Sequence, residues 1–245
     1  MKLLNKKPAL PAVCAVIVGA GSSQRMGGEN KLLIPLGGTP VLAHTLLAFE
    51  RCEYIRDIVL VCREGDIAPY AALAMQFSVS KLRTTVRGGN NRTASALAGI
   101  LSAPTNTELI AIHDAARPLV SDEIISETVS AAMEYGAAAP IVPLKDSIKR
   151  LRNDMILSDV SRSSLGAVQT PQIFHRSVIQ SALERAVAEN QTFTDDCAAV
   201  ESAGQPIRAT TGSYRNIKIT TYEDVVLAEA LLTEQEKEAQ LYVRR

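Results

Sequence analysis

The stretch VIVGAGSSQRMGGENK, residues 16–31, begins as a buried strand and becomes a glycine-rich polar loop within a few residues. It continues a β-branched run that starts at Val13, as expected of a strand buried on both faces. Small residues after such a strand let backbone N–H groups approach anionic oxygens, and Arg25 and Lys31 add charge at two separate points. The stretch therefore predicts an open α/β sheet with a triphosphate site at the carboxyl end of its first strand.

Two familiar phosphate-loop templates do not fit this loop. Counted from Gly21, the P-loop template requires glycine and lysine where Met26 and Gly27 stand. Counted from Gly19, the dinucleotide fingerprint requires its third glycine where Gln24 stands. For the loop taken alone, a plain turn flanked by basic surface residues remains the alternative.

Composition and charge restrict the class of protein. The chain has 245 residues, 47% of them hydrophobic and 21% charged, which is typical of a globular protein with a sizeable core. Lys+Arg and Asp+Glu balance at 26 each, so no overall field favours nucleic acid or an anionic membrane. The 4 cysteines form no CxxC pair, and no apolar run approaches the roughly 20 residues of a membrane span. We expect a cytoplasmic protein with reduced thiols.

Short apolar strands alternate with amphipathic helices along almost the whole chain. Strands are predicted at residues 13–18, 58–62, 82–86, 109–113 and 137–144. Helices are predicted at residues 40–49 (capped by Thr39), 67–77, 93–101, 121–135 (capped by Ser121), 177–189 and 195–203. This order predicts an α/β fold, with a Rossmann-like, mainly parallel sheet and helices on both faces, as a single domain over residues 1–245.

Two later segments have a different pattern. Residues 145–164 are polar without a helical stripe, which predicts either a disordered surface loop or a protruding hairpin arm that packs on another subunit. Residues 214–219 alternate and are predicted to be extended, with Asn216 and Lys218 on the polar side. Thr220 and Glu223 then match a capping box that opens a final helix through Leu232 or beyond.

Polar motifs follow other strands of the predicted sheet. In VRGGNNRTASAL (86–97), backbone groups beside Gly88 and Gly89 and the hydroxyl of Ser95 are candidates for a base or ribose edge. A tight turn with a helix cap explains that motif equally well. In IAIHDAARPLV (110–120), Asp114 is a candidate acceptor for a hydroxyl and Arg117 a candidate phosphate ligand, unless the two only pair to shape the loop.

One residue and one further motif are assigned no chemistry. His113 has no visible partner, so a hydrogen-bonded structural histidine is favoured over a general base. In TDDCAAVE (194–201), helix capping by Thr194 and Asp195 is a sufficient explanation.

Taken together, these stretches resemble the 2-C-methyl-D-erythritol 4-phosphate cytidylyltransferases. The resemblance runs from about residue 13 to about residue 232 and rests on GAGSSQRMG…NK, GGNNRTASALAG, HDAARPLV, DSIKR, QTPQIF, TDDCAAVE and RNIKIT, in that order. HDAARP together with QTPQ.F and NIKIT, at these separations, is much more specific than the glycine loop. Gly19 and Ser23 stand where the family more often has alanine and glycine, and Ser147 where threonine is common.

The resemblance implies a CTP-dependent enzyme that transfers CMP to methylerythritol 4-phosphate. It implies catalytic roles for Arg25, Lys31, Arg162 and Lys218. The implied nucleotide-binding residues are Ala20, Gly21, Ser22, Ser23, Gly88, Gly89, Ser95 and Asp114. The implied substrate-binding residues are Asp114, Arg117, Ser147, Arg162, Thr170 and Lys218. It also implies Mg²⁺ held mainly by the nucleotide phosphates, and a homodimer whose 145–164 arm carries Arg162 to the second subunit.

The residue types fit this chemistry on independent grounds. The acceptor's phosphate oxygen is already anionic at neutral pH, so charge compensation and in-line positioning are required rather than a catalytic base. Three alternatives remain: a cytidylyltransferase for another polyol phosphate such as ribitol 5-phosphate, a molybdenum-cofactor nucleotidyltransferase and a catalytically silent nucleotide-binding protein. The molybdenum-cofactor alternative leaves HDAARP and NIKIT unexplained, and binding alone would not need all four cations.

Overall fold

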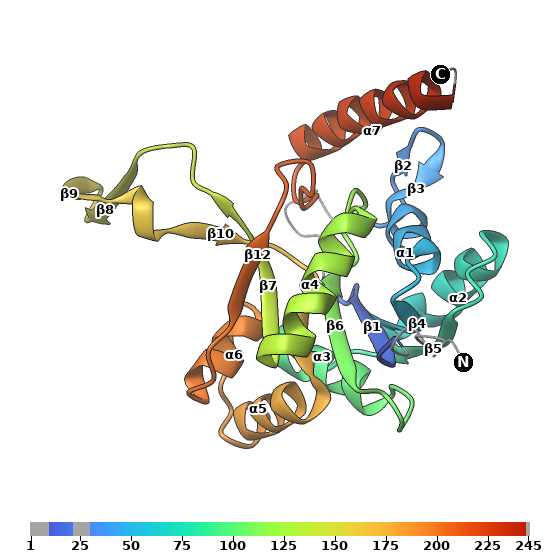
Figure 1. Cartoon of the computed structure of the whole chain (residues 1–245), viewed down its shortest axis with the longest axis horizontal. Helices are drawn as coiled ribbons and strands as arrows, with labels where there is room; N and C mark the ends of the chain where they lie inside the picture. The colour runs from blue at the N-terminus through green and yellow to red at the C-terminus, as the bar shows by residue number, and fades with distance from the viewer. Residues whose placement is uncertain (1–9, 22–29, 244–245) are drawn as a thin grey trace, which may run out of the picture.

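The computed structural model describes residues 10–21 and 30–243. Its central sheet has the strand order β10-β7-β11-β6-β1-β4-β5, with β12 paired to β7 (Figure 1). A parallel core is formed by β5 (Leu82–Arg87), β4 (Ile55–Cys62), β1 (Val13–Val18) and β6 (Leu109–Asp114). These are the β-branched runs of the sequence, and the parallel α/β prediction is confirmed.

The other half of the sheet mixes strand directions. β11 (Gln172–His175) lies antiparallel between β6 and β7 (Ala137–Pro143), and β10 (Gly166–Val168) pairs antiparallel with the outer part of β7. β12 (Arg208–Thr211) runs parallel to β7. None of β10, β11 and β12 was predicted from the sequence, because each has only three or four residues and lacks a long apolar run.

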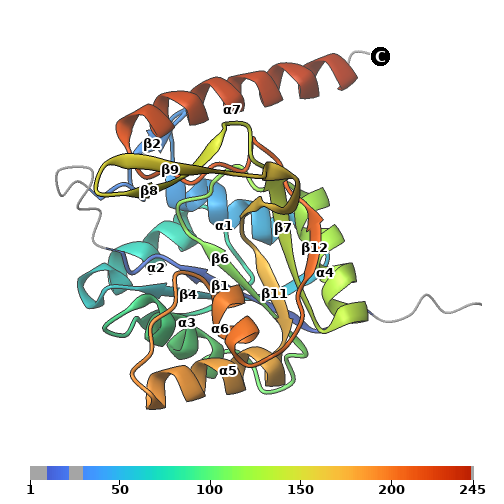
Figure 2. The ribbon, with the colours of Figure 1, turned by 90° about the vertical axis from the view of Figure 1, so that its left-hand side faces the viewer.

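Helices cover both faces of the sheet (Figure 2). Alternate residues of β1 belong to two different core clusters. Ala15 and Ile17 pack with α1 (Val41–Arg51), α2 (Ile67–Gln76) and α4 (Asp122–Tyr135). Cys14 and Val16 pack with α3 (Arg92–Leu101), α5 (Arg176–Ala188) and α6 (Asp196–Ser202). The four cysteines are buried free thiols.

Side-chain caps fix the beginnings of three helices. Asn91, Ser121 and Asp195 each accept a hydrogen bond from the backbone N–H three residues further on, at the starts of α3, α4 and α6. The predicted cap at Thr39 is wrong. Thr39 belongs instead to β3 (Thr39–Pro40), which pairs with β2 (Pro35–Leu36), and α1 begins after Pro40 without a side-chain cap. A short 3-10 turn, η2 (Glu64–Asp66), precedes α2.

The polar stretch at residues 145–164 is a hairpin arm rather than a disordered loop. β8 (Ile148–Arg152) and β9 (Met155–Val160) pair with each other in a separate two-stranded sheet, followed by η3 (Arg162–Ser164). Asn153 and Asp154 form the turn with positive φ. Figure 1 shows the arm extending away from the central sheet.

The C-terminal region differs from its prediction in two ways. Residues 214–219 form a turn and an irregular segment instead of a strand. The helix α7 (Tyr222–Val243) is opened by Asp224, whose Oδ2 accepts from the backbone N–H groups of Thr220 and Thr221, so Asp224 fills the place expected of Glu223. Among the described helices, none is both long and apolar enough to cross a bilayer.

Candidate active site

A pocket of about 430 Å³ lies at the carboxyl ends of β1 and β6. Segments that are distant in the chain form its walls: the loop after β1, the start of α3, the end of β6 and the loop before α7. It is lined by Val18, Gly19, Ala20, Gly21, Lys31, Leu32, Gly89, Asn90, Asn91, Arg92, Ser95, Asp114, Ala116 and Lys218. The pocket is thus where strand-end sites of open α/β sheets are expected.

The loop after β1 lines one wall of the pocket. Gly19 donates its N–H to Val61 O at 2.7 Å, which extends the β1–β4 pairing up to the pocket. Ala20 and Gly21 line the pocket, and a Cβ at Gly21 would meet no atom of the described residues within 4 Å. Ser22, Ser23 and Arg25, which were predicted to complete this loop, lie outside the described residues.

Close packing at Gly88 brings the second glycine motif against the first. A Cβ at Gly88 would lie 2.8 Å from both Ala20 Cβ and Ser95 Oγ, so no larger residue fits without displacing the loop. Gly89 and Ser95 line the pocket, whereas Gly88 is not among its lining residues. Ser95 donates its hydroxyl to Asn91 O at 2.7 Å. The predicted nucleotide-binding residues at 20, 21, 89 and 95 therefore lie together on one side.

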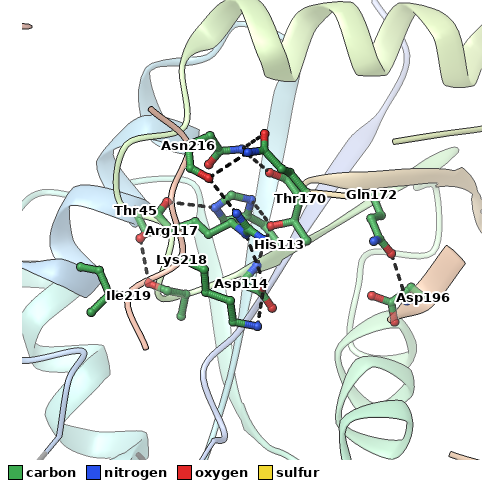
Figure 3. A network of polar contacts seen from close by, with 12 residues as sticks. Thr45, His113, Asp114, Arg117, Thr170, Gln172, Asp196, Asn216, Lys218 and Ile219 are labelled. Carbon is green, nitrogen blue, oxygen red and sulfur yellow. Dashed lines mark hydrogen bonds and ion pairs between the residues drawn. The ribbon is translucent and has the colours of Figure 1, made fainter. Parts of the chain in front are cut away.

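Asp114, at the end of β6, is the charged centre of the opposite wall (Figure 3). Its Oδ2 lies 3.0 Å from Lys218 Nζ and 3.4 Å from Arg117 Nε, and its Oδ1 lies 4.0 Å from Arg92 Nη2. Burial alone would raise the pKa of Asp114, but these cations, Lys218 foremost, outweigh burial and hold the pKa well below its usual range. The group is a permanent anion that presents hydrogen-bond acceptors.

His113 and Thr170 support Asp114 from behind. His113 is fully buried, with Nε2 3.1 Å from Arg117 O and Nδ1 3.0 Å from Thr170 Oγ1. Thr170 Oγ1 also accepts from the backbone N–H of Asp114 at 3.2 Å. Burial lowers the pKa of His113 to about 4, so it is neutral and structural, as its sequence context indicated. Thr170, a predicted substrate ligand, thus has its hydroxyl engaged in this network and is buried.

The loop before α7 brings Lys218 to Asp114. Asn216 is fully buried, and its Nδ2 donates to Thr170 O at 2.9 Å. The backbone carbonyl of Asn216 accepts from Arg117 Nη1 at 2.7 Å. Lys31 Nζ donates to Ile219 O at 2.8 Å, and this bond joins the segment after β1 to the segment before α7 at the pocket. The alternating pattern placed Asn216 on the polar face with Lys218, and the structure instead uses it as a buried anchor.

Arg92 and Asp196 are pocket-side charges that were not predicted from the sequence. Arg92 lines the pocket from the first turn of α3, and its Nη2 lies 2.6 Å from Oδ2 of the buried Asp196. The carboxamide of Gln172 accepts from the backbone N–H groups of Asp196 and Cys197. The sequence gives one indication of a further role for Asp196. Capping of α6 needs only one of the two adjacent carboxylates, and Asp195 supplies it.

The two predicted residues of the arm lie apart from this pocket. Ser147 is exposed at the start of the arm, and Arg162 is exposed on η3, with Nη1 donating to Lys145 O. Neither lines the pocket described above. Within one chain, the structure brings together Lys31, Lys218, Asp114 and Arg117, but not Ser147 or Arg162.

The arrangement suits a ligand that carries both phosphates and hydroxyls. Lys31, Arg92 and Lys218 supply positive charge along the pocket, and residues 19–21 and 89–91 also line it. Asp114 supplies an acceptor for a hydroxyl in the midst of the cations. No described side chain here forms a nucleophile–base pair, and transfer between phosphates needs none.

The chain is similar to known cytidylyltransferases over nearly its whole length. Residues 13–234 match the sequence profile of the 2-C-methyl-D-erythritol 4-phosphate cytidylyltransferases. Similar sequences include relatives of that name from two bacteria. The relative from Halalkalibacterium halodurans is 41% identical over 91% of this chain and 97% of its own length. The relative from Desulforamulus reducens is 43% identical over 90% of this chain and 95% of its own length.

Solved structures agree with the sequence comparison. The 4-diphosphocytidyl-2C-methyl-D-erythritol synthase of Anaerococcus prevotii superimposes with a TM-score of 0.82 at 30% identity, covering 91% of this chain and 96% of that one. The Thermus thermophilus 2-C-methyl-D-erythritol 4-phosphate cytidylyltransferase superimposes with a TM-score of 0.75 at 28% identity, covering 89% and 98%. With the profile match and the pocket at the ends of β1 and β6, these findings show that the chain belongs to the 2-C-methyl-D-erythritol 4-phosphate cytidylyltransferase family.

Proposed function

We propose that this protein transfers CMP from CTP to 2-C-methyl-D-erythritol 4-phosphate, giving 4-diphosphocytidyl-2-C-methyl-D-erythritol and pyrophosphate. The observation that carries the proposal is the convergence of Lys31, Lys218 and Asp114 from three distant segments on one pocket, in a chain of this family. This activity places the enzyme in isoprenoid precursor biosynthesis. The cytoplasm is the proposed compartment.

In the proposed reaction, an anionic phosphate oxygen of the acceptor attacks the α-phosphorus of CTP. A new P–O bond forms there while the bond from the α-phosphorus to the bridging oxygen breaks, and pyrophosphate leaves with that electron pair. The two anions repel each other until cations intervene. Lys31 and Lys218 compensate the charge in the pocket, and Arg25 has the same predicted role in the loop outside the described residues.

The remaining predicted contacts position the nucleotide and the acceptor. The backbone of Ala20 and Gly21 and the segment at Gly88, Gly89 and Ser95 are proposed to hold the cytidine, and Asp114 a ribose hydroxyl. Arg117 and Thr170 are proposed to act largely through Asp114, since both are hydrogen-bonded to it. These contacts would fix the in-line geometry on which the rate depends.

Mg²⁺ is proposed as the cofactor, held mainly by the nucleotide phosphates. Among the described residues, no group of three or more His, Cys, Asp or Glu side chains could hold a metal ion, which fits an ion held by the phosphates rather than by a protein cage. When bound, the ion would neutralise charge on the triphosphate.

We also propose that the enzyme works as a homodimer through the 145–164 arm. Leu151, Met155, Ile156 and Leu157 are each more than half exposed on β8 and β9, which is unusual for a hairpin that packs on nothing. A second copy of the chain would cover these side chains. The arm would then bring Arg162, and Ser147 with it, to the partner's pocket.

The test is pyrophosphate release from CTP and Mg²⁺ with each candidate acceptor. Release with methylerythritol 4-phosphate and little with ribitol 5-phosphate is expected, and the reverse preference would overturn the proposed substrate. No release with either acceptor, despite CTP binding, would indicate a silent nucleotide-binding protein.

A variant of the pocket lysine shows whether the activity belongs to this site. Lys218→Met is expected to lower turnover about 10²–10³-fold, because it removes one preorganised charge at the reacting phosphates. Lys237→Met, at an exposed position of α7, is the matched control and should leave turnover unchanged. Equal turnover in both variants would exclude Lys218 from the site.

A further inference from the structure

Arg92 lies between two carboxylates of very different burial. Its Nη2 is 2.6 Å from Asp196 Oδ2 but 4.0 Å from Asp114 Oδ1, so it is hydrogen-bonded to the first carboxylate and not to the second. Asp196 is 1% exposed, whereas Asp114 lines the pocket. The structure therefore keeps the guanidinium on the buried side of the site (Figure 3 shows Asp114 and Asp196).

Asp196 is held rigidly in that place. Its backbone N–H and that of Cys197 both donate to Gln172 Oε1, at 3.0 and 2.9 Å, and Gln172 pairs with Ile112, two residues before Asp114 on β6. Phe193 N donates to the hydroxyl of Thr93 at 3.2 Å, so the segment before α6 is attached to the first turn of α3. The Asp196 carboxylate and the Arg92 backbone thus keep a fixed separation.

Arg92 is the partner on which Asp196 depends. Within the described part of the chain, Oδ1 of Asp196 is buried with no hydrogen-bond partner, so Oδ2 makes the only one of that carboxylate. Burial raises the pKa of Asp196, and the charge of Arg92 opposes that rise. A buried carboxylate with a single strong contact retains its cation firmly, because separating them would leave an uncompensated charge.

We propose that Asp196 is a positioning residue for nucleotide recognition, which keeps Arg92 away from Asp114 so that Oδ1 of Asp114 remains free for a ribose hydroxyl. This inference rests on the proposed CTP-dependent function. Without the charge of Asp196, Arg92 would move the short distance to Asp114 and form a direct ion pair. The acceptor would then be occupied before the nucleotide arrives, and selection for the ribose hydroxyl would fall.

The experiment measures binding of CTP, 2′-deoxy-CTP and 3′-deoxy-CTP by calorimetry, without acceptor. The wild type should prefer CTP by about 10-fold or more over the analogue that lacks the hydroxyl Asp114 accepts, as expected of a hydrogen bond to a charged group. Asp196→Asn should reduce that preference to less than about 3-fold while the protein remains folded. Asp195→Asn is the matched control: it keeps the cap of α6, since asparagine caps as well as aspartate, and should keep the wild-type preference.

A double variant separates positioning from a general loss of structure. Arg92→Gln with Asp196→Asn removes the guanidinium as well, so Asp114 is free again and the preference for CTP should return toward the wild-type ratio. This variant also decides the question if Asp196→Asn alone does not fold. An unchanged preference in Asp196→Asn, or a lost preference in the double variant, would overturn the inference while the proposed function stands. Absence of CTP binding by the wild type would overturn both.

Discussion

His113 and Asp114 are consecutive buried residues of β6, yet one is neutral and the other is charged. His113 contacts a threonine hydroxyl and a backbone carbonyl, which stabilise the neutral ring in a single tautomer. Asp114 is surrounded by Lys218, Arg92 and Arg117, which together offset the loss of hydration of its carboxylate. The neutral His113 ring therefore holds Thr170 and the Arg117 backbone in place around the Asp114 carboxylate. The two residues affect the pH dependence of stability in different ways.

The lowered pKa of His113 makes stability depend on pH between about 6.5 and about 4. In that window the unfolded chain binds a proton that the folded chain does not, so the free energy of unfolding rises with pH and falls on acidification. A pKa shift of this size changes the free energy of unfolding by on the order of 3 kcal/mol across that window. Urea unfolding of wild type and His113→Asn at pH 7 and pH 4.5 should show a smaller pH dependence in the variant.

His175 provides the control for that measurement. It is exposed, and His175→Asn should retain the pH dependence of the wild type. If His113→Asn and His175→Asn lose equal stability on acidification, buried His113 is not the source of the effect.

Among single residues, the sequence predicted the charged side chains that follow a strong local signal. Asp114 and Arg117 directly follow a buried strand, and Lys31 follows a glycine loop, so their placement at a strand end could be expected. Arg92 and Asp196 could not be paired in this way, because they are 104 residues apart and each begins a helix that has a simpler local explanation.

The position of helix α3 depends on one glycine. A Cβ at Gly99 would lie 2.3 Å from Val16 Cγ1 and 2.7 Å from Val61 Cγ2, so α3 packs directly on β1 and β4. The first turn of the same helix supplies Arg92 and Ser95 to the pocket. Packing in the core and geometry at the site are thus linked through α3.

Gly99→Ala is expected to destabilise the protein although alanine is the better helix former. Overpacking against two stiff valines costs about 1–3 kcal/mol, whereas the gain in helix propensity is about 1 kcal/mol. Chemical unfolding should show a net loss of up to about 2 kcal/mol, and CTP affinity should fall as the first turn of α3 shifts.

Gly65→Ala is the comparison for this substitution. A Cβ at Gly65 would meet no atom of the part of the chain that the structure describes within 4 Å, so the free energy of unfolding should change by no more than about 0.5 kcal/mol. A Gly99→Ala protein as stable as Gly65→Ala would show that α3 can move off the sheet without cost.

Elements were predictable where the local pattern and the tertiary structure agree. The long strands and the capped helices agree, because burial and capping both leave clear signals in a few adjacent residues. The short strands β10, β11 and β12 are defined by pairing with β7, which the local sequence does not encode. The segment at residues 214–219 alternates like a strand but is fixed by side-chain hydrogen bonds of Asn216.

At the scale of the whole molecule, the arm has two features that contacts within one chain do not account for. It carries exposed apolar side chains on β8 and β9, and its predicted catalytic residue, Arg162, does not line the pocket of its own chain. In the proposed dimer, each active site would combine the body of one protomer with the arm of the other.

Mixing two inactive variants tests this arrangement. Arg162→Ala and Lys218→Met should each lose most of their turnover, while Arg162→Ala should bind CTP almost normally. In hybrid dimers, the body of the Arg162→Ala protomer meets the intact arm of the other, so equal mixing should restore about a quarter of wild-type turnover.

The two variants are mixed in the unfolded state and refolded together, so that hybrid dimers form. Each variant unfolded and refolded by itself is the control and should remain inactive. If the mixture gains no turnover although hybrid dimers form, Arg162 does not act on the partner's site.

The hydrogen bond from Lys31 to Ile219 spans 188 positions of the chain, and this has a consequence for how the enzyme is made. During synthesis, β1 and the glycine loop emerge first, and Lys218 follows much later in the chain. A nascent chain that has not reached Lys218 therefore carries only part of the proposed phosphate site. CTP can stabilise the complete site only after the segment at Lys218 has left the ribosome and joined the loop.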